Sequence, residues 1–119
     1  MIDESQFRTV ADYVGIGCKE GARLVFGGGR CLQDSGGFYH EPSILSAVNN
    51  SMRVAQEEIF GPVMSVLTFR DAAEAVAMAN DSIYGLAGAV WSSNINTAHK
   101  VAAAVRVGTM GINNYFGGI

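Results

Sequence analysis

The apolar residues of the first segment lie three or four positions apart, at Phe7, Val10, Val14 and Cys18. This spacing predicts a helix over residues 3–20 that presents one apolar face. Asp3 or Ser5 is placed to cap the start of this helix, and Gly21 is placed to end it. The short apolar run at residues 22–26 is followed by three glycines, which is typical of a strand that ends in a turn.

The middle of the chain carries weaker signals. Residues 31–37 are polar and contain glycine, so they are interpreted as a loop. Residues 38–40 are expected to be extended on the way to Pro42, because the residue before a proline avoids the helical region. Strand and loop signals are mixed over residues 42–48, and residues 52–58 are ambiguous, with room for a helical turn.

Clearer elements follow. Residues 63–69 are rich in β-branched and apolar residues, which favours a buried strand. Asp71 and Glu74 have the spacing of a capping box, in which acidic side chains satisfy free backbone N–H groups, and the helix they start is predicted to end near Asn80. Residues 86–91 form another short apolar strand candidate.

The last predicted helix has an apolar stripe made of Ile95, Ala98, Ala102 and Val105. Asn94 or Asn96 can cap its start, and Gly108 lies just past its end, where a left-handed residue is expected. A final strand is predicted over residues 109–113. Strands therefore alternate with helices in the second half, which indicates an α/β layer structure with a largely parallel sheet. Without a linker or repeat, residues 1–119 are interpreted as one domain.

Composition narrows the function classes. Of the 119 residues, 49% are hydrophobic and 16% are charged, which favours a folded protein over a disordered one. The formal net charge is −3 and the basic residues are scattered, so nucleic-acid binding is not expected. The acidic start does not resemble a signal peptide, and the apolar stretch from Ile83 to Trp91 is too short to span a bilayer. We therefore expect a cytoplasmic protein without a membrane segment.

Neither cysteine nor glycine patterns indicate catalysis. Cys18 and Cys31 are interpreted as free thiols, without the spacing of a zinc site. Cys18 is expected to pack at the core edge of its helix, and Cys31 has a neighbouring cation but no identifiable base. The triple glycine fails the dinucleotide fingerprint, because Leu32 stands where a glycine is required. No catalytic residue and no metal site is predicted from these patterns.

The richest chemistry lies in the segment from Glu57 to Val63, where two adjacent carboxylates precede an aromatic ring and a Gly-Pro turn. A carboxylate can accept two hydrogen bonds from a vicinal diol such as a ribose. An aromatic ring such as Phe60 can pack against the planar face of a cofactor. The alternative is that Phe60 belongs to the core while Glu57 and Glu58 face solvent.

This segment resembles the E-E-I-F-G-P-V signature of aldehyde dehydrogenases. Further similarities follow in the family's order and with its spacing, and they cover essentially the whole chain: the helix start at residues 2–7, the helix-to-strand passage at 20–29, the segment at 38–43, the A-N-x-x-x-Y-G-L-A run at 79–87, and the G-T strand at 108–113. The chain is similar to the C-terminal part of the family's catalytic domain.

The resemblance assigns roles to three residues. It implies that Glu58 holds the ribose hydroxyls next to the nicotinamide and that Phe60 packs near the nicotinamide itself. It implies a supporting role for Asn113 near the floor of the active site. The expected cofactor in full-length members is NAD or NADP, and the expected reaction is oxidation of an aldehyde to a carboxylic acid.

The departures from the family pattern bear on activity. The F-x-x-x-G-Q-x-C motif of the nucleophile and the E-L-G-G motif of the general base are absent from the sequence. We therefore expect the chain to supply one wall of the nicotinamide-ribose site and to be inactive alone. The alternative is a non-catalytic α/β module that self-associates or binds a partner. The expected partners are further copies of the chain or a complementary upstream half.

Overall fold

The computed structural model describes residues 1–115 and divides into two compact units, Met1–Thr68 (unit 1) and Phe69–Ile119 (unit 2). The last residues of the chain, 116–119, lie outside the described part. Unit 1 holds α1 (Glu4–Glu20), β1 (Arg23–Phe26), β2 (Arg30–Cys31), a 3-10 turn (Gln33–Ser35), β3 (Tyr39–His40), β4 (Ser43–Ser46), α2 (Arg53–Gln56) and β5 (Val63–Ser65). Unit 2 holds α3 (Ala72–Asn80), β6 (Ala87–Val90), α4 (Ile95–Ala104) and β7 (Thr109–Ile112).

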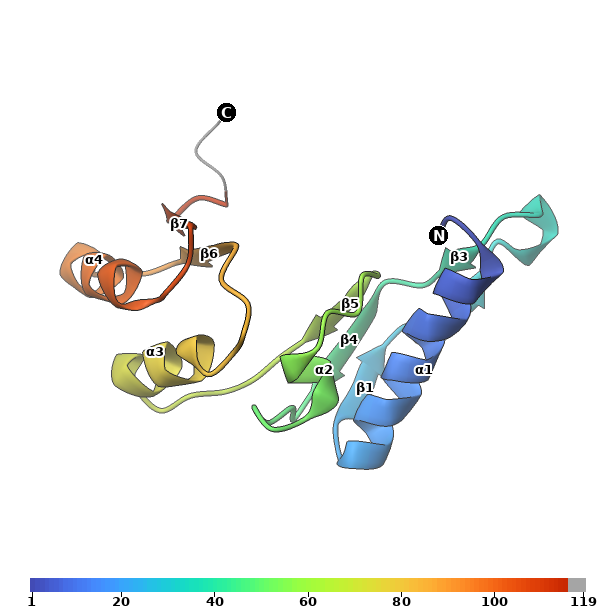
Figure 1. Cartoon of the computed structure of the whole chain (residues 1–119), viewed down its shortest axis with the longest axis horizontal. Coiled ribbons are helices and arrows are strands. Elements are labelled where there is room, and N and C mark those ends of the chain that lie inside the picture. Colours follow the sequence, from blue (N-terminus) through green and yellow to red (C-terminus); the bar gives the residue numbers. More distant parts are fainter. Residues whose placement is uncertain (116–119) are drawn as a thin grey trace. The chain divides into compact units, whose positions relative to one another are not determined.

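Unit 1 is built on a three-stranded sheet of order β1-β4-β5. Strand β4 is antiparallel to β1 and parallel to β5, while β2 and β3 form a separate antiparallel pair. Helix α1 packs against β1, β3 and α2, and it runs alongside the sheet in Figure 1. The arrangement is an α/β layer, as the sequence predicts, with strands of both directions.

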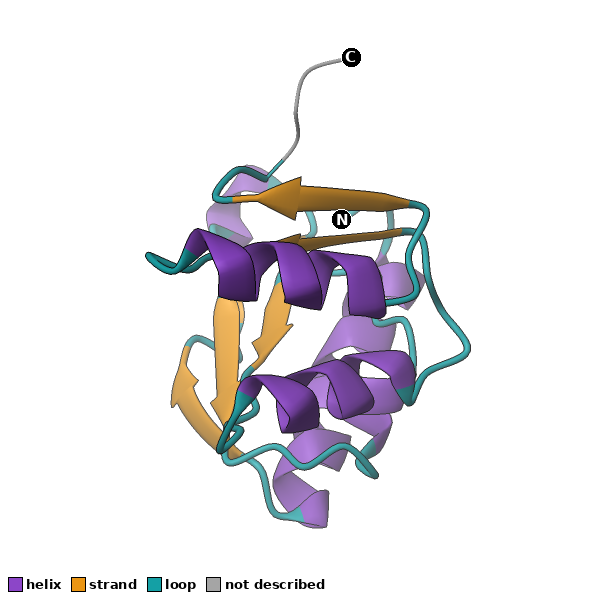
Figure 2. Cartoon of the chain, turned by 90° about the vertical axis from the view of Figure 1, so that its left-hand side faces the viewer, coloured by secondary structure: helices purple, strands orange, loops and turns teal. Residues whose placement is uncertain are grey.

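Unit 2 is a smaller version of the same architecture. Strands β6 and β7 pair in parallel, with Ala87 opposite Thr109 and Val90 opposite Ile112. Helix α4 connects the two strands and packs on both, while α3 packs on α4 (Figure 2). The expected parallel pairing of the second half is therefore present within this unit.

Helix α1 begins and ends where its local signals place it. The Asp3 carboxylate accepts a hydrogen bond from the Gln6 N–H at 2.8 Å, and Gly21 ends the helix with a φ of 110°. The expectation that Cys18 packs at the core edge is wrong, because Cys18 is exposed and Gly17 is buried in its place. A Cβ on Gly17 would lie 2.9 Å from a methyl carbon of Val54. Glycine therefore lets the neighbouring element approach α1 closely.

The core of unit 1 gathers apolar side chains from both helices, the sheet and the connecting segments, namely Val10, Val14, Ala22, Leu45, Val48, Met52, Val54 and Ile59. Side chains alternate along a strand, so Ile44 lies on the face of β4 opposite to buried Leu45. The pairing register places Phe26 of β1 and Met64 of β5 on either side of Ile44. We call the apolar row Phe26–Ile44–Met64 the outer row.

The prediction of a buried strand over residues 63–69 is only partly correct. Strand β5 ends at Ser65, and Met64 is 56% exposed. Residues of β5 that face the core, such as Val63, are partly buried, whereas in the outer row Phe26 and Met64 are exposed and Ile44 is only partly buried. The apolar content of residues 63–69 predicts burial, but it does not indicate that one face of the strand is exposed to solvent.

The helices of unit 2 start at capping residues. The Asp71 carboxylate accepts from the Glu74 N–H at 2.9 Å, and Asn94, rather than Asn96, accepts from the Thr97 N–H at 3.1 Å. The expectation for Gly108 is wrong, because α4 ends at Ala104, its C-cap residue Val105 has a φ of −80°, and Gly108 has no positive φ. Gly108 instead donates its N–H to the Gly85 carbonyl at 2.8 Å, where the chain segments leading into β6 and β7 come close together.

Candidate functional site

Within the segment from Glu57 to Val63, residues 58–60 turn their side chains alternately outward and inward. Ile59 is buried in the core of unit 1, whereas its neighbours Glu58 and Phe60 are exposed, Phe60 by 77%. The alternative that Phe60 belongs to the core is therefore wrong. The carboxylate of Glu58 and the ring of Phe60 lie two residues apart on the open side of one short segment.

The two adjacent carboxylates have different environments. The Arg53 guanidinium donates to both carboxylate oxygens of Glu57, each at 2.8 Å, and the Tyr13 hydroxyl donates to one of them at 2.7 Å. The hydrogen bonds from Arg53 and then from Tyr13 lower the pKa of Glu57 to about 2. Glu57 also raises the pKa of Arg53 and the pKa of Tyr13. Glu57 therefore ties α2 to α1.

Glu58 contrasts with its neighbour. Among residues 1–115 no hydrogen bond or ion pair engages its carboxylate, and the side chain is exposed. Both carboxylate oxygens are thus free to accept hydrogen bonds from a ligand. A diol presents two donors at a spacing that one carboxylate can accept, so the side chain fits the ribose role that the resemblance assigns to it.

Phe60 is held in place through its backbone. Its φ of 55° is in the left-handed region, which an L residue other than glycine, asparagine or aspartate rarely adopts. The Gln6 side-chain amide donates to the Phe60 carbonyl at 2.9 Å. A Cβ on the next residue, Gly61, would collide with the Val10 side chain, so this turn lies directly on α1. Helix α1 and the Gly-Pro turn together direct the ring outward.

Asn113 lies in unit 2, just after β7, with a φ of 51°. Its side-chain oxygen accepts from the Ser92 N–H at 2.9 Å, and its side-chain nitrogen donates to the Ser92 carbonyl at 3.1 Å. The side chain thus joins the ends of β6 and β7. The supporting role in an active site remains a prediction, to which the structure adds a role in holding this turn.

Three residues that hold the segment were not identified from the sequence, namely Gln6, Tyr13 and Arg53. The Arg53–Glu57 pair has the spacing of a helical ion pair and was detectable in principle. The contacts of Tyr13 and Gln6 span 44 and 54 residues, so no local pattern could reveal them.

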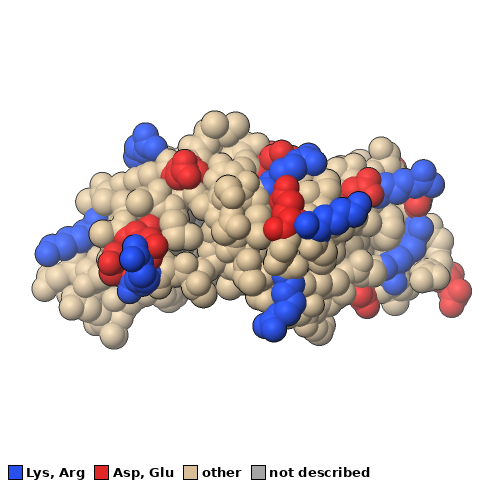
Figure 3. Space-filling model, turned by 90° about the horizontal axis from the view of Figure 1, so that it is seen from below, with Lys and Arg blue, Asp and Glu red and all other residues tan. Residues whose placement is uncertain are grey.

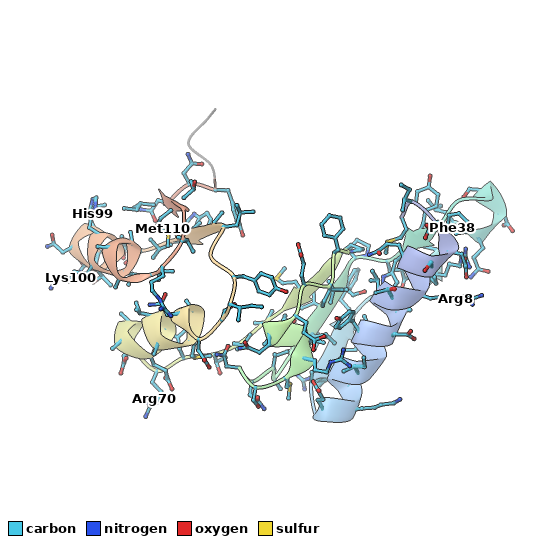
Figure 4. All side chains as sticks on the ribbon, viewed as in Figure 1. Arg8, Phe38, Arg70, His99, Lys100 and Met110 are labelled. Atoms are coloured by element: carbon cyan, nitrogen blue, oxygen red, sulfur yellow. The ribbon has the colours of Figure 1, made fainter. Side chains whose placement is uncertain are left out.

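The remaining candidate groups do not form a second reactive centre in the described part. Cys31 is partly buried, and no group of three or more His, Cys, Asp or Glu residues within positions 1–115 could hold a metal ion. Figure 4 shows His99 and Lys100 pointing outward from α4. Over the described helices, none is both long and apolar enough to cross a bilayer.

Several surface charges form ion pairs, and the basic residues do not gather in one cluster. Arg8 and Arg30 both bond to Glu4, and Arg70 bonds to Glu74 at 3.0 Å. The hydrogen bond from Arg30 lowers the pKa of Glu4, and that from Arg70 lowers the pKa of Glu74. On the face drawn in Figure 3, basic and acidic side chains lie next to one another, without a broad basic patch.

Comparison with known proteins decides the family. A model of the aldehyde dehydrogenase family matches residues 1–118. The chain belongs to the aldehyde dehydrogenase family. It is 51% identical over 110 residues to betaine aldehyde dehydrogenase of Bacillus subtilis (strain 168), which covers 89% of this chain and 22% of that protein. The resemblance inferred from the sequence is thus confirmed.

Solved structures of aldehyde dehydrogenases share the fold. An indole-3-acetaldehyde dehydrogenase in complex with NAD⁺ is 55% identical with a TM-score of 0.94, over 98% of this chain and 23% of that chain. Betaine aldehyde dehydrogenase from Staphylococcus aureus in complex with NAD⁺ is 39% identical with a TM-score of 0.95, over 100% and 24%. These complexes confirm NAD as a cofactor of full-length relatives. The chain spans about a quarter of their length.

Proposed function

We propose that this aldehyde dehydrogenase segment forms one wall of a nicotinamide-ribose site in the oxidation of an aldehyde to a carboxylic acid. The observation that carries the proposal is the pair of outward side chains on the Glu57–Val63 segment. Glu58 presents a carboxylate with no partner in the described part, and Phe60 presents an exposed ring two residues away. When bound, the nicotinamide supplies the hydride acceptor of the reaction.

In this role Glu58 orients the ribose, and Phe60 packs against the nicotinamide ring attached to it. The carboxylate accepts hydrogen bonds from two vicinal hydroxyls, which fixes the rotation of the attached ring. The phenyl ring covers one side of that ring and excludes water from it. The Tyr13–Glu57–Arg53 contacts and the Gln6 amide hold both groups in position before a ligand arrives.

The segment does not supply the reacting groups of this chemistry. The nucleophile and general-base motifs of the family are absent from the sequence, and Cys18 and Cys31 do not match the nucleophile. We therefore expect no NAD(P)H production by the purified 119-residue chain with a panel of aldehydes. Turnover that requires one of the two cysteines would contradict this expectation.

A chimera tests the ribose role directly. The matched segment of Bacillus subtilis betaine aldehyde dehydrogenase is replaced by the present sequence, and NADH production is measured. Loss of charge-assisted hydrogen bonds in a Glu58→Ala chimera should lower kcat/KM by about 10-fold or more. Asp34→Ala, which removes an exposed carboxylate from the 3-10 turn, is the matched control and should leave kcat/KM unchanged. Equal effects of the two substitutions would refute the role.

The alternative is a non-catalytic α/β module that self-associates or binds a partner. The outer row Phe26–Ile44–Met64 favours it, because Phe26 and Met64 are exposed apolar side chains on one sheet face. The partner that would bind to the outer row is a further copy of the chain or a complementary upstream half. Sedimentation at micromolar concentration should show association that Met64→Glu weakens. Thr9→Glu, on the exposed side of α1, is the control. A monomeric wild type would count against self-association.

The cellular location follows only from the sequence. The lack of a long apolar stretch in the sequence favours a cytoplasmic protein, and this expectation stays a proposal. Fluorescence microscopy of the tagged chain would test it, with a membrane or extracellular signal as the contrary result.

A further inference from the structure

Unit 2 contains a pocket of about 270 Å³ that lies outside the Glu57–Val63 segment. Its lining residues come from the end of α3, from the turn before β6 and from the segment between α4 and β7, namely Asn80, Ser82, Ile83, Tyr84, Gly85 and Arg106. None of these residues has a role in the function proposed above. The pocket combines one cation with both polar and apolar walls.

Arg106 is anchored at this pocket by its own backbone and side chain. Its N–H donates to the Asn80 side-chain oxygen at 2.7 Å, and its guanidinium Nη2 donates to the Asn80 carbonyl at 2.6 Å. The Asn80 side-chain nitrogen in turn donates to the Ala104 carbonyl at 2.9 Å. Three hydrogen bonds therefore hold this part of the chain against the end of α3, so the guanidinium is positioned in advance.

Arg106 differs from most of the other arginines in what it contacts, although Arg23, which donates to the Ser46 hydroxyl, also lacks a glutamate partner within residues 1–115. Arg8, Arg30, Arg53 and Arg70 each pair with a glutamate. The ion pairs formed within residues 1–115 do not include Arg106, and its guanidinium donates to the main-chain carbonyl of Asn80. A guanidinium has five N–H donors in a planar fork, so most of its donor capacity remains available.

The other walls define what can accompany an anion. The Ser82 hydroxyl accepts a hydrogen bond from the Tyr84 N–H at 3.1 Å, which leaves its O–H free to donate. Ile83 is 90% exposed and Tyr84 is half exposed. These side chains place apolar surface beside the guanidinium and the hydroxyl, so an apolar group attached to the anion would find contacts.

We propose that this pocket binds a carboxylate that carries a short apolar group. A planar carboxylate matches the guanidinium fork with two parallel hydrogen bonds, and Ser82 can donate a third. A phosphate dianion is less suited, because Arg106 is the single cation of the lining and the chain carries a formal net charge of −3. The apolar group lies against Ile83 and Tyr84.

Isovalerate is the test ligand, and isovaleramide is its neutral isostere. The two are titrated into the ¹⁵N-labelled 119-residue chain, and backbone amide shifts are followed. Isovalerate should give saturable shifts at Tyr84, Gly85 and Arg106 with a Kd on the order of 1 mM, since the site is open to solvent. Isovaleramide should bind at least about 10-fold more weakly, because the charge-assisted hydrogen bonds are lost.

Two variants locate the effect. Arg106→Gln should weaken isovalerate binding by about 10-fold, whereas Arg23→Gln, which removes an exposed arginine from β1, should not change it. Ser82→Ala provides a second route if Arg106→Gln disturbs the amide spectrum of α3 and α4. Equal binding of isovaleramide, shifts that do not saturate, or loss of binding in Arg23→Gln would overturn the proposal. Tighter binding of inorganic phosphate than of isovalerate would overturn the carboxylate assignment.

Discussion

The two units share an α/β architecture but differ in how much they bury. Unit 1 closes eight apolar residues into one cluster, with Leu45 and Val10 fully buried. In unit 2, Ala98 is the buried apolar residue of the described part, while Ile83, Leu86 and Trp91 are exposed. Burial of apolar surface is the main favourable term in folding. Unit 1 therefore has a hydrophobic core of its own. Unit 2 has the helices and strands of an α/β layer, but it buries little of the apolar surface that would stabilise such a layer.

The largest expected difference between the units concerns core truncation. Leu45→Ala removes the central side chain of unit 1 and should lower its free energy of unfolding by about 2–5 kcal/mol. Leu86→Ala removes the same atoms from an exposed position of unit 2 and should change stability by less than about 0.5 kcal/mol. Urea unfolding followed at amides of each unit measures both. Similar losses would show that unit 2 also depends on its leucine.

Local stability should separate the units in the unaltered chain. The amides of β4 are expected to exchange with solvent at least about 10-fold more slowly than those of β6, because opening β4 exposes the core of unit 1. Native-state hydrogen exchange by NMR gives both rates in one sample. Equal protection would mean that the units open together and that unit 2 resists local opening as well as unit 1 does.

Left-handed residues in the two units should respond to glycine in opposite directions. At Phe60, glycine relieves a backbone conformation that costs about 1–2 kcal/mol, offset by about 0.5–1 kcal/mol from the freer unfolded chain. Phe60→Gly should therefore leave unit 1 as stable or slightly more stable.

At Asn113, glycine relieves less, because asparagine tolerates this conformation, and it removes two hydrogen bonds to Ser92. Asn113→Gly should destabilise unit 2 by about 1 kcal/mol. Residue-resolved urea unfolding tests the sign at each site. A destabilised Phe60→Gly variant would indicate that the exposed ring contributes to folding.

The smallest expected effect depends on pH. The pKa of Glu57 is lowered from 4.5 to about 2, so its contribution to the stability of unit 1 is complete above pH 4.5 and is lost as pH falls through about 2. Glu57→Gln should flatten this part of the profile for unit 1. The profile of unit 2, in which Glu74 has a lowered pKa, should stay unchanged. A parallel change in both units would show that the effect is not local.

Local signals predicted the ends of elements better than their surroundings. Asp3, Asp71 and Asn94 cap helices through hydrogen bonds to residues three positions away, which is a range that sequence spacing encodes. The predictions for Cys18 and Gly108 were wrong because the surroundings of these residues are set by β4, α2 and the turn before β6. Periodicity indicates which residues can share a face, and packing decides where that face lies.

The candidate site was also predictable only in part from the sequence. The bottom-up pattern of two carboxylates and an aromatic ring left two interpretations open, and the family resemblance favoured the outward one. Placement of Phe60 in the left-handed region and the bonds from Gln6 and Tyr13 to this segment depend on contacts across more than 40 residues. No local pattern contains that information, so the support of the site could not be predicted.

Gly17 sets how closely α2 can approach α1. The α1–α2 distance is limited by a hydrogen atom at this position, and α2 leads directly into the segment that carries Glu58. A methyl group at this position would collide with the Val54 side chain and would push α2 and the segment after it away from α1. The position of the Glu57–Val63 segment relative to α1 therefore depends on Gly17, so a larger residue at Gly17 would displace Glu58 without changing any side chain of that segment.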